Sequence, residues 1–181
     1  KEDVSHRYFA DGNPTEKIVF TEYSDTECPF CKQFHGTIKD LLKENGGTYA
    51  WVYKHFPLSF HTYAQKEAES IECVRELAGD ETAFRYIDLI FAVTPSNNKL
   101  PQDALYQIAS EFKVSKSKLK SCLESNKYAE KVKAQLNEGV QKGVEGTPYT
   151  FVTKNENGTS TVLGVINGAQ PREAFEALLT K

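Results

Sequence analysis

The chain has 181 residues, and its 22 lysines and arginines against 25 aspartates and glutamates give a formal net charge of −3. This balance argues against nucleic acid as a partner, because nucleic-acid-binding domains usually carry a basic excess. No run approaches the roughly 18 apolar residues of a membrane span, and the length allows one core with an inserted subdomain.

Cysteine usage and the start of the chain bear on the compartment. Four cysteines, an even number, fit an oxidising compartment better than the cytosol. The chain begins with Lys1 and contains no methionine, so we expect a processed or trimmed start; removal of a signal peptide and removal of a lipid anchor both remain open.

The first half of the chain predicts a strand, a helix and a second strand. The turn at residues 11–14 precedes an apolar, β-rich run at 18–20. After Cys28, apolar residues recur at three- and four-residue steps, which predicts a helix that ends at Gly46-Gly47. An aromatic and β-branched run at 49–56 predicts the next strand. This order is the βαβ unit of a parallel sheet.

From about residue 61 to about residue 142 the pattern becomes wholly helical. Breaker residues and caps divide it into helices expected at 62–77, 80–92, 102–112, 116–123 and 126–142. Strand patterns return at 149–153 and 160–165, joined by the turn Asn155-Glu156-Asn157-Gly158, and a last helix is expected at 171–179. We therefore expect an α/β fold in which 1–60 and 143–181 form one discontinuous domain and 61–142 a helical insertion.

The candidate reactive site is Cys28-Pro29-Phe30-Cys31, at the junction of the first strand and helix. Pro29 suits the first helical turn, and Cys28 then lies among free backbone N–H groups at the positive end of the helix dipole, which favours its thiolate. We expect Cys28 to be exposed and Cys31, one turn into the helix, to be more enclosed. Redox chemistry is the favoured interpretation, but a zinc site with His35 as a third ligand and an inert structural disulfide remain open from the spacing alone.

Three motifs in order make the sequence resemble the DsbA-like thiol–disulfide oxidoreductases of the thioredoxin superfamily. The resemblance covers nearly the whole chain and rests on Glu22-Tyr23-Ser24-Asp25 leading into Cys28-Pro29-Phe30-Cys31, on Tyr53-Lys54-His55-Phe56-Pro57-Leu58, and on Gly143-Val144-Glu145-Gly146-Thr147-Pro148. It implies a thioredoxin fold that carries a helical insertion, with neither cofactor nor metal. It also implies that Cys28 is the nucleophile and Cys31 the resolving cysteine.

Further site residues follow from the resemblance. Thr147-Pro148 matches the family's cis-proline loop, whose backbone edge could pair with an extended substrate. Glu22 matches the buried acidic position, and strand alternation turns it toward a helical layer. We expect Lys54, on the neighbouring strand, to pair with Glu22 beneath the cysteines and to help pass the proton of Cys31.

The residues around the cysteines also predict the strength of the oxidant. Pro29 and Phe30 stand between the cysteines and tune the thiolate, and Phe30 cannot donate or carry charge as the histidine of the best-known relative can. Glu27, directly before Cys28, would oppose a thiolate if its charge is close. We therefore expect an oxidant weaker than that relative.

Cys73 and Cys122 are predicted to form a second, structural disulfide within the insertion. Each lies beside apolar residues of a predicted helix, so two separate buried thiols are the alternative. The bond is favoured because similar chains tend to carry both cysteines.

The resemblance implies a monomeric oxidase in the periplasm or another extracytoplasmic part of the bacterial cell envelope. Its substrates would be unfolded or reduced proteins, and a membrane redox partner would re-oxidise it. Two alternatives remain. One is an isomerase or reductase kept as the dithiol, toward which Thr147 points. The other is a peptide-binding chaperone with incidental redox activity.

Overall fold

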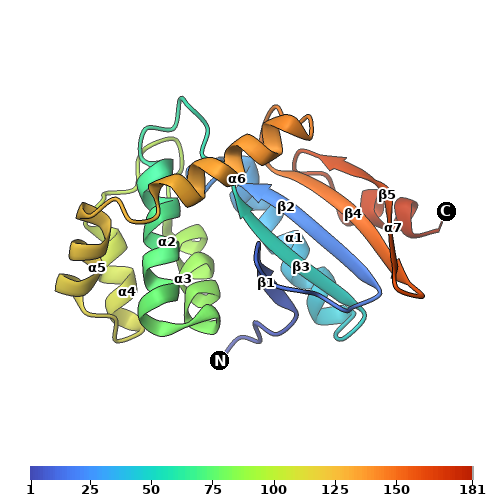
Figure 1. Ribbon diagram of the computed structural model, residues 1–181, viewed down its shortest axis with the longest axis horizontal. Coiled ribbons are helices and arrows are strands. Elements are labelled where there is room, and N and C mark those ends of the chain that lie inside the picture. The colour runs from blue at the N-terminus through green and yellow to red at the C-terminus, as the bar shows by residue number, and fades with distance from the viewer. Residues whose placement is uncertain (181) are drawn as a thin grey trace.

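The computed structural model describes residues 1–180, and its centre is a five-stranded mixed sheet (Figure 1). The strands lie in the order β1-β3-β2-β4-β5; β1, β3 and β2 are parallel, whereas β4 and β5 pair antiparallel. Their bounds are β1 Arg7–Phe9, β2 Ile18–Ser24, β3 Tyr49–His55, β4 Tyr149–Glu156 and β5 Thr159–Asn167. Central β2 leads directly into the cysteine motif.

Two helices cover one face of the sheet, α1 (Pro29–Glu44) and α7 (Arg172–Leu179), which lie behind the strands in Figure 1. Three aromatic rings join these layers. Phe175 of α7 stacks on Phe34 of α1 at 5.5 Å and meets Phe20 of β2 edge-on at 5.0 Å. Burying such rings contributes much of the core energy and fixes where α1 begins relative to β2.

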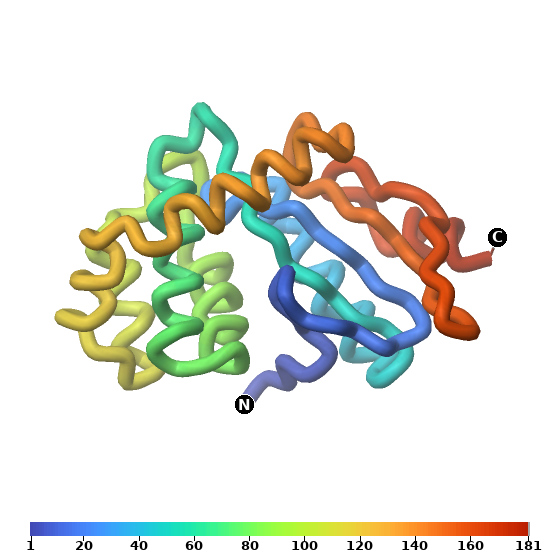
Figure 2. The backbone as a smooth tube through the Cα atoms, in the orientation of Figure 1, coloured from blue at the N-terminus to red at the C-terminus, as the bar shows by residue number. Residues whose placement is uncertain are grey.

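Five helices lie between β3 and β4 in the chain. They are α2 Ala64–Ala78, α3 Asp80–Val93, α4 Ala104–Glu111, α5 Lys116–Glu124 and α6 Ala129–Gln141. The first four form a block beside the sheet, and the tube drawing shows α6 running from that block toward the strands (Figure 2). Gly139 permits the close approach of α6, because a Cβ there would lie 2.8 Å from the Phe56 ring.

The predicted thioredoxin-type order of elements is present, with one addition. The sequence did not predict β1, which has three residues and is too short to show an alternating pattern; it adds to the edge of β3, where the Trp51 N–H donates to the His6 carbonyl. Asn157 and Gly158 form the hairpin turn, both with positive φ. The division into a discontinuous domain and an insertion stays a prediction.

The four-helix block contains the bond between Cys73 of α2 and Cys122 of α5, with an S–S distance of 2.03 Å and a Cα–Cα distance of 6.0 Å. Cys73 is fully buried, whereas Cys122 is half-buried. Within residues 1–180, none of the helices combines the length and the apolar character needed to cross a bilayer.

Removing this disulfide with Cys73→Ala and Cys122→Ala together should lower the free energy of unfolding by about 4 kcal/mol, because the bond closes a loop of about 50 residues in the unfolded chain. Urea unfolding would measure the loss. The control is Ser121→Ala, an exposed neighbour on α5, which should change stability by less than about 0.5 kcal/mol. Free thiols at both positions in the air-oxidised, denatured protein would contradict the assignment.

Candidate active site

Cys28 is the N-cap residue of α1, with extended backbone angles of φ −84° and ψ 121° and with Pro29 at the first helical position. Its N–H donates to the Asp25 carbonyl at 3.1 Å, and its own carbonyl accepts from the Lys32 N–H at 3.1 Å. Cys31 lies one turn inside the helix and is fully buried. The sulfur of Cys28 is therefore at the end where backbone N–H groups have no helical acceptor.

The loop before β4 covers the cysteines. The Thr147–Pro148 peptide bond is cis, and the Cys28 thiol donates to the Thr147 carbonyl at 3.6 Å. The expectation that Cys28 is exposed was wrong, because with this loop above it only 3% of the residue is accessible. Cys31 Sγ accepts from the Asp25 N–H at 3.4 Å.

The two thiols have opposite acidities. The hydrogen bond from Cys31 is the main cause that lowers the pKa of Cys28 to about 6; burial opposes it, and Thr147 and the N–H groups of Phe30 and Cys31 add to it. Burial, the charge of Cys28 and that of Glu22 raise the pKa of Cys31 well above its ordinary value. The dithiol can therefore hold one thiolate, on Cys28.

The predicted pairing of Glu22 with Lys54 is wrong. Glu22 is in register with Tyr53, so the next residue, Lys54, projects from the opposite face of the sheet. There the Lys54 Nζ donates to Glu138 of α6 at 2.5 Å, and the Tyr23 hydroxyl donates to the same oxygen at 2.9 Å. Lys54 therefore links α6 to the sheet through its ion pair with Glu138. It lies on the opposite face from Glu22 and does not share in the proton transfer of Cys31.

Glu22 lies beneath the cysteines, and no basic side chain within residues 1–180 forms an ion pair with it. Its side chain is fully buried, and its Oε2 accepts from the Trp51 indole N–H at 3.0 Å, whereas Oε1 is buried without a donor. Burial is the main cause that raises the pKa of Glu22 to about 8; the Cys28 charge also raises it, while Ser24 and Trp51 lower it. Glu22 is thus a carboxyl group able to exchange a proton near neutral pH.

Asp25 links several segments of the site. It lies in the Glu22-Tyr23-Ser24-Asp25 motif, but the sequence alone does not indicate its role. Its carboxylate accepts from the N–H groups of Glu27 and Leu58 and from His61 Nδ1, at 2.7 to 2.8 Å. Burial raises the pKa of Asp25 in spite of these donors. Because its backbone also bonds to both cysteines, Asp25 ties the loop after β3 to the redox motif.

Glu27 was expected to oppose the thiolate, yet the pKa of Cys28 is lowered. Its side chain turns inward: Oε2 accepts from the Asn98 N–H at 2.6 Å, and Oε1 is buried without a donor. Burial is the main cause, and Glu27 the second, that raise the pKa of Glu67 to about 9. Glu67 therefore stays protonated beside Glu27. This contact joins the loop between β2 and α1 to helix α2, and the local sequence does not predict it.

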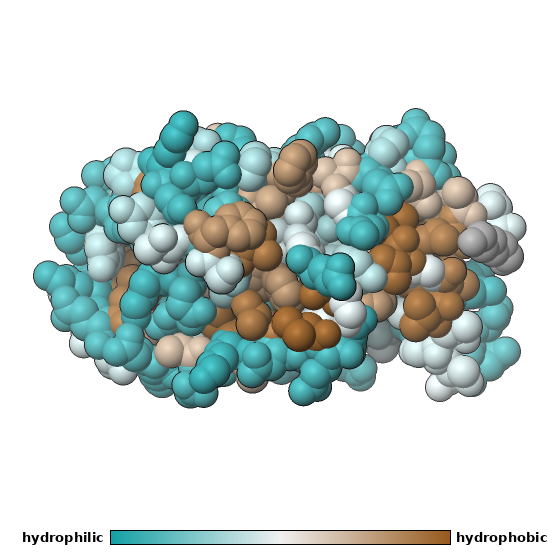
Figure 3. All heavy atoms as spheres, turned by 90° about the horizontal axis from the view of Figure 1, so that it is seen from above, coloured by the Kyte–Doolittle hydropathy of each residue, from teal (hydrophilic) through white to brown (hydrophobic). Residues whose placement is uncertain are grey.

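Two exposed aromatic side chains lie in the cysteine motif and on a segment next to it. Phe30 is 59% exposed and Phe60 is 69% exposed, and Asn98 joins their segments by donating to the Phe60 carbonyl while its N–H bonds to Glu27. Seen from above, apolar side chains gather along the middle of the molecule with polar ones around them (Figure 3). The surroundings of Cys28 thus offer apolar surface to another molecule.

His35, the candidate third zinc ligand, is engaged elsewhere. Its Nε2 hydrogen-bonds Asp88 of α3 at 2.6 Å, and its ring packs edge-on against Trp51. Residues 1–180 contain no cluster of three or more histidine, cysteine or acidic side chains placed to hold a metal ion.

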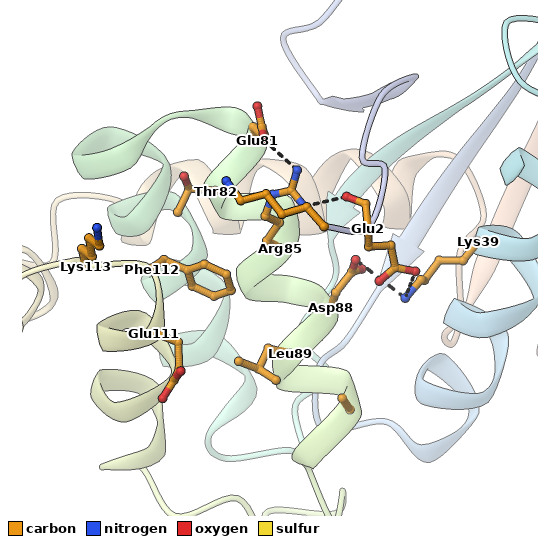
Figure 4. Close-up of a pocket in the computed structure, with 12 residues that line it drawn as sticks. Glu2, Lys39, Glu81, Thr82, Arg85, Asp88, Leu89, Glu111, Phe112 and Lys113 are labelled. Carbon is orange, nitrogen blue, oxygen red and sulfur yellow. Dashed lines mark hydrogen bonds and ion pairs between the residues drawn. The ribbon is translucent and has the colours of Figure 1, made fainter.

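A separate cavity of about 710 Å³ lies between the N-terminal segment, α1, α3 and the segment after α4 (Figure 4). Its lining includes neither cysteine and none of the predicted site residues. Arg85 is paired with Glu81 and with the Glu2 carbonyl, and Lys39 is paired with Glu2. Several charged side chains that line the cavity therefore already have partners. We assign it no part in the redox site.

Comparison with known proteins supports the thioredoxin architecture. A family model described as thioredoxin matches residues 6–178. Pseudomonas aeruginosa DsbA2 superposes with a TM-score of 0.77 at 23% identity over 93% of this chain and 90% of that one. BdbD from Bacillus subtilis gives 0.74 at 19% identity over 93% and 89%.

Curated relatives of similar sequence are much longer than this chain. The Na(+)/H(+) antiporter NhaA 1 of Salinispora arenicola is 29% identical over 137 residues, which are 75% of this chain and 20% of the antiporter. The NhaA 3 antiporter of Salinispora tropica is 28% identical over the same shares. The chain therefore spans about a fifth of the length of these relatives.

Alkylation of the reduced protein over a pH series should modify Cys28 with a midpoint near pH 6, because hydrogen bonds stabilise its thiolate. Cys31→Ala should move the midpoint up toward the ordinary thiol value of about 8.5, since the main donor is lost, and Cys31→Ser, which keeps a donor, should move it less. A midpoint at or above about 8.5 in the unaltered protein would contradict this electrostatic account.

Proposed function

The chain belongs to the thioredoxin family, and from this membership and the geometry of its dithiol we propose that it is a thiol–disulfide oxidoreductase that introduces disulfides into other proteins. The observation that carries the proposal is the asymmetry of the two thiols. Cys28, at the helix N-terminus, is acidic and lies at the loop edge, whereas Cys31 is enclosed and holds its proton.

The proposed reaction begins with the Cys28–Cys31 disulfide. A substrate thiolate attacks Cys28 Sγ, the intramolecular S–S bond breaks, and the electron pair leaves on Cys31, which takes up a proton. A second substrate thiolate attacks the substrate sulfur of the mixed disulfide, and Cys28 leaves as a thiolate. The substrate gains a disulfide, and the protein is reduced to the dithiol.

The acidity of Cys28 supports donation of the disulfide. With a pKa of about 6, below the ordinary thiol value of about 8.5, most of Cys28 is thiolate at pH 7. The thiolate stabilises the reduced form by about 1.4 kcal/mol at that pH, or about 30 mV for a two-electron couple. This contribution is modest, and together with Phe30 it supports the proposal of a weak oxidant.

We assign the site residues as follows. When a substrate is oxidised, Cys28 is the attacked sulfur and Cys31 is the first leaving group. When the dithiol is re-oxidised, Cys28 is the nucleophile and Cys31 resolves the mixed disulfide, and Glu22 exchanges the proton of Cys31 in both directions. Pro29 and Phe30 set the start of the helix and the environment of the sulfur. Thr147 and Pro148 supply the loop, on which an extended substrate could pair as an added strand.

Reduced or unfolded polypeptides are the proposed substrates, because they expose apolar side chains that exposed Phe30 and Phe60 can contact. We further propose a monomer in an extracytoplasmic compartment that a membrane redox partner re-oxidises, as the likeness to DsbA2 and BdbD suggests. The ion exchange named in the antiporter relatives is not extended to this chain, because the match covers only a fifth of them.

The redox state of Cys28 and Cys31 in the native compartment tests the direction of the reaction. Acid quenching followed by a thiol-reactive mass tag should find most of the protein as the disulfide. Mostly dithiol would contradict the oxidase and favour an isomerase or reductase.

A purified assay separates catalysis from peptide binding. The oxidised protein should form disulfides in a reduced, unfolded polypeptide, and Cys28→Ser should abolish this activity, while the exposed Ser121→Ala control retains it. Undiminished disulfide formation with Cys28→Ser would mean that the Cys28–Cys31 disulfide is not its source and would contradict the proposal. If Cys28→Ser instead suppresses aggregation of the polypeptide as well as the unaltered protein does, a peptide-binding role independent of the thiols would be supported.

A further inference from the structure

Trp51, the single tryptophan of the chain, lies on β3 and belongs to the same buried core as Cys28 and Cys31. It is in register with Phe20, two residues before Glu22, and therefore shares the α1-facing side of the sheet with Glu22. Its indole N–H donates to Glu22 Oε2 at 3.0 Å, and both side chains are almost completely buried. Lys54, the partner expected from the sequence, lies on the other face of the sheet.

The indole is held in place from two further elements. The His35 ring of α1 packs edge-on against it with centroids 5.0 Å apart, and the Arg7 guanidinium of β1 lies 5.3 Å from its centroid. His35 and Arg7 are themselves fixed, since both donate to Asp88 Oδ1 of α3. Trp51 therefore cannot turn its N–H away from Glu22 without disturbing this network.

This contact makes the two oxygens of Glu22 unequal. Oε2 has the indole donor, whereas Oε1 is buried and accepts no hydrogen bond from residues 1–180, although the nearby Ser24 hydroxyl lowers the pKa of Glu22. We propose that Trp51 is a positioning residue which holds Oε2 so that Oε1 takes the proton of Cys31. The inference deepens the proposed function and rests on it for the role of Cys31.

Glu22 Oε1 accepts the Cys31 proton and becomes a carboxylic acid, while the Cys31 sulfur attacks Cys28 Sγ of the mixed disulfide. The Cys28–Cys31 bond forms, the bond between Cys28 and the other sulfur breaks, and the electron pair departs on that sulfur as a thiolate. The indole bond favours the carboxylate before the transfer, because hydrogen bonds to a charged acceptor are stronger than those to a neutral one.

The titration of Glu22 can be distinguished from those of the other groups near its contact with Trp51. Cys28 and Cys31 face Glu22 from α1, and Tyr53 faces it from β3 with a pKa raised well above its ordinary value by burial. On β4 the residue opposite Glu22 is Thr150, which does not titrate. Burial lowers the pKa of His35, so its protonation beside the indole occurs on the acid side.

The fluorescence of Trp51 tests the contact without any exchange activity. In the oxidised protein, whose two site cysteines cannot titrate, emission should show one transition above the ordinary glutamate value. Reduction should raise its midpoint toward about 8, because the Cys28 charge then opposes ionisation of Glu22. Glu22→Gln should abolish the transition. Persistence of the same transition in Glu22→Gln, or its absence from the unaltered protein, would overturn the proposal.

The resolving step is followed with Ellman's disulfide as the probe. The reduced protein releases one thionitrobenzoate when Cys28 attacks and a second when Cys31 resolves the mixed disulfide. Trp51→Phe should shift the pH profile of the second release upward by about one unit and slow it about tenfold at pH 7, because fewer Glu22 carboxylates remain ionised.

Tyr86→Phe is the matched control, since it removes a buried aromatic donor bonded to Ser70 and Leu105 within the helical block. It should leave the profile unchanged. An unchanged profile in folded Trp51→Phe would overturn the proposal, and if that variant does not fold, the Glu22→Gln titration still decides. Failure to oxidise polypeptides, with both Ellman phases intact, would count against the proposed function alone.

Discussion

The site depends on one constraint: two thiols and a carboxyl group share a space from which water is almost wholly excluded. Negative charges in such a space repel one another strongly, because little solvent screens them. Cys28 can be charged since backbone donors, Thr147 and the Cys31 thiol stabilise it, whereas burial keeps Cys31 and Glu22 protonated over much of the neutral range. The charge therefore rests on the sulfur at the helix end until a reaction removes it.

The surrounding fold maintains this arrangement through contacts that reach far along the chain. Asp25 bonds to the loop after β3, and Glu27 bonds to the loop after α3, so two segments of the connecting block are fastened to the three residues before Cys28. Three successive residues of the latter loop, Ser96, Asn97 and Asn98, have positive φ. Backbone conformations of this kind are unfavourable and persist where neighbouring contacts hold them.

Much of the architecture could be predicted from the sequence, because its signals are local. The apolar spacing after Cys28 predicts α1, and the Asn157-Gly158 pair predicts the hairpin between β4 and β5. The position of Cys28 at the start of α1 follows from the same pattern. The burial of Cys28 could not be predicted, because the loop that covers it contains Thr147, which is 119 residues away in the chain.

The partner of Glu22 could not be predicted, because it depends on strand register. A shift of one residue between β2 and β3 exchanges the faces of Lys54 and Tyr53, and no local signal fixes that register. Glu138, the partner of Lys54, comes from α6, 84 residues later. Trp51 had a usable signal, since it is two residues before Tyr53 and therefore lies on the same face of β3.

The central claim, that Cys28 attacks and Cys31 resolves, is tested most directly by trapping the intermediate. Cys31→Ser incubated with an oxidised, unfolded polypeptide should accumulate a mixed disulfide through Cys28 that dithiothreitol releases, whereas Cys28→Ser should accumulate none. Equal trapping by both variants, or a trapped complex that maps to Cys73 or Cys122, would contradict the account.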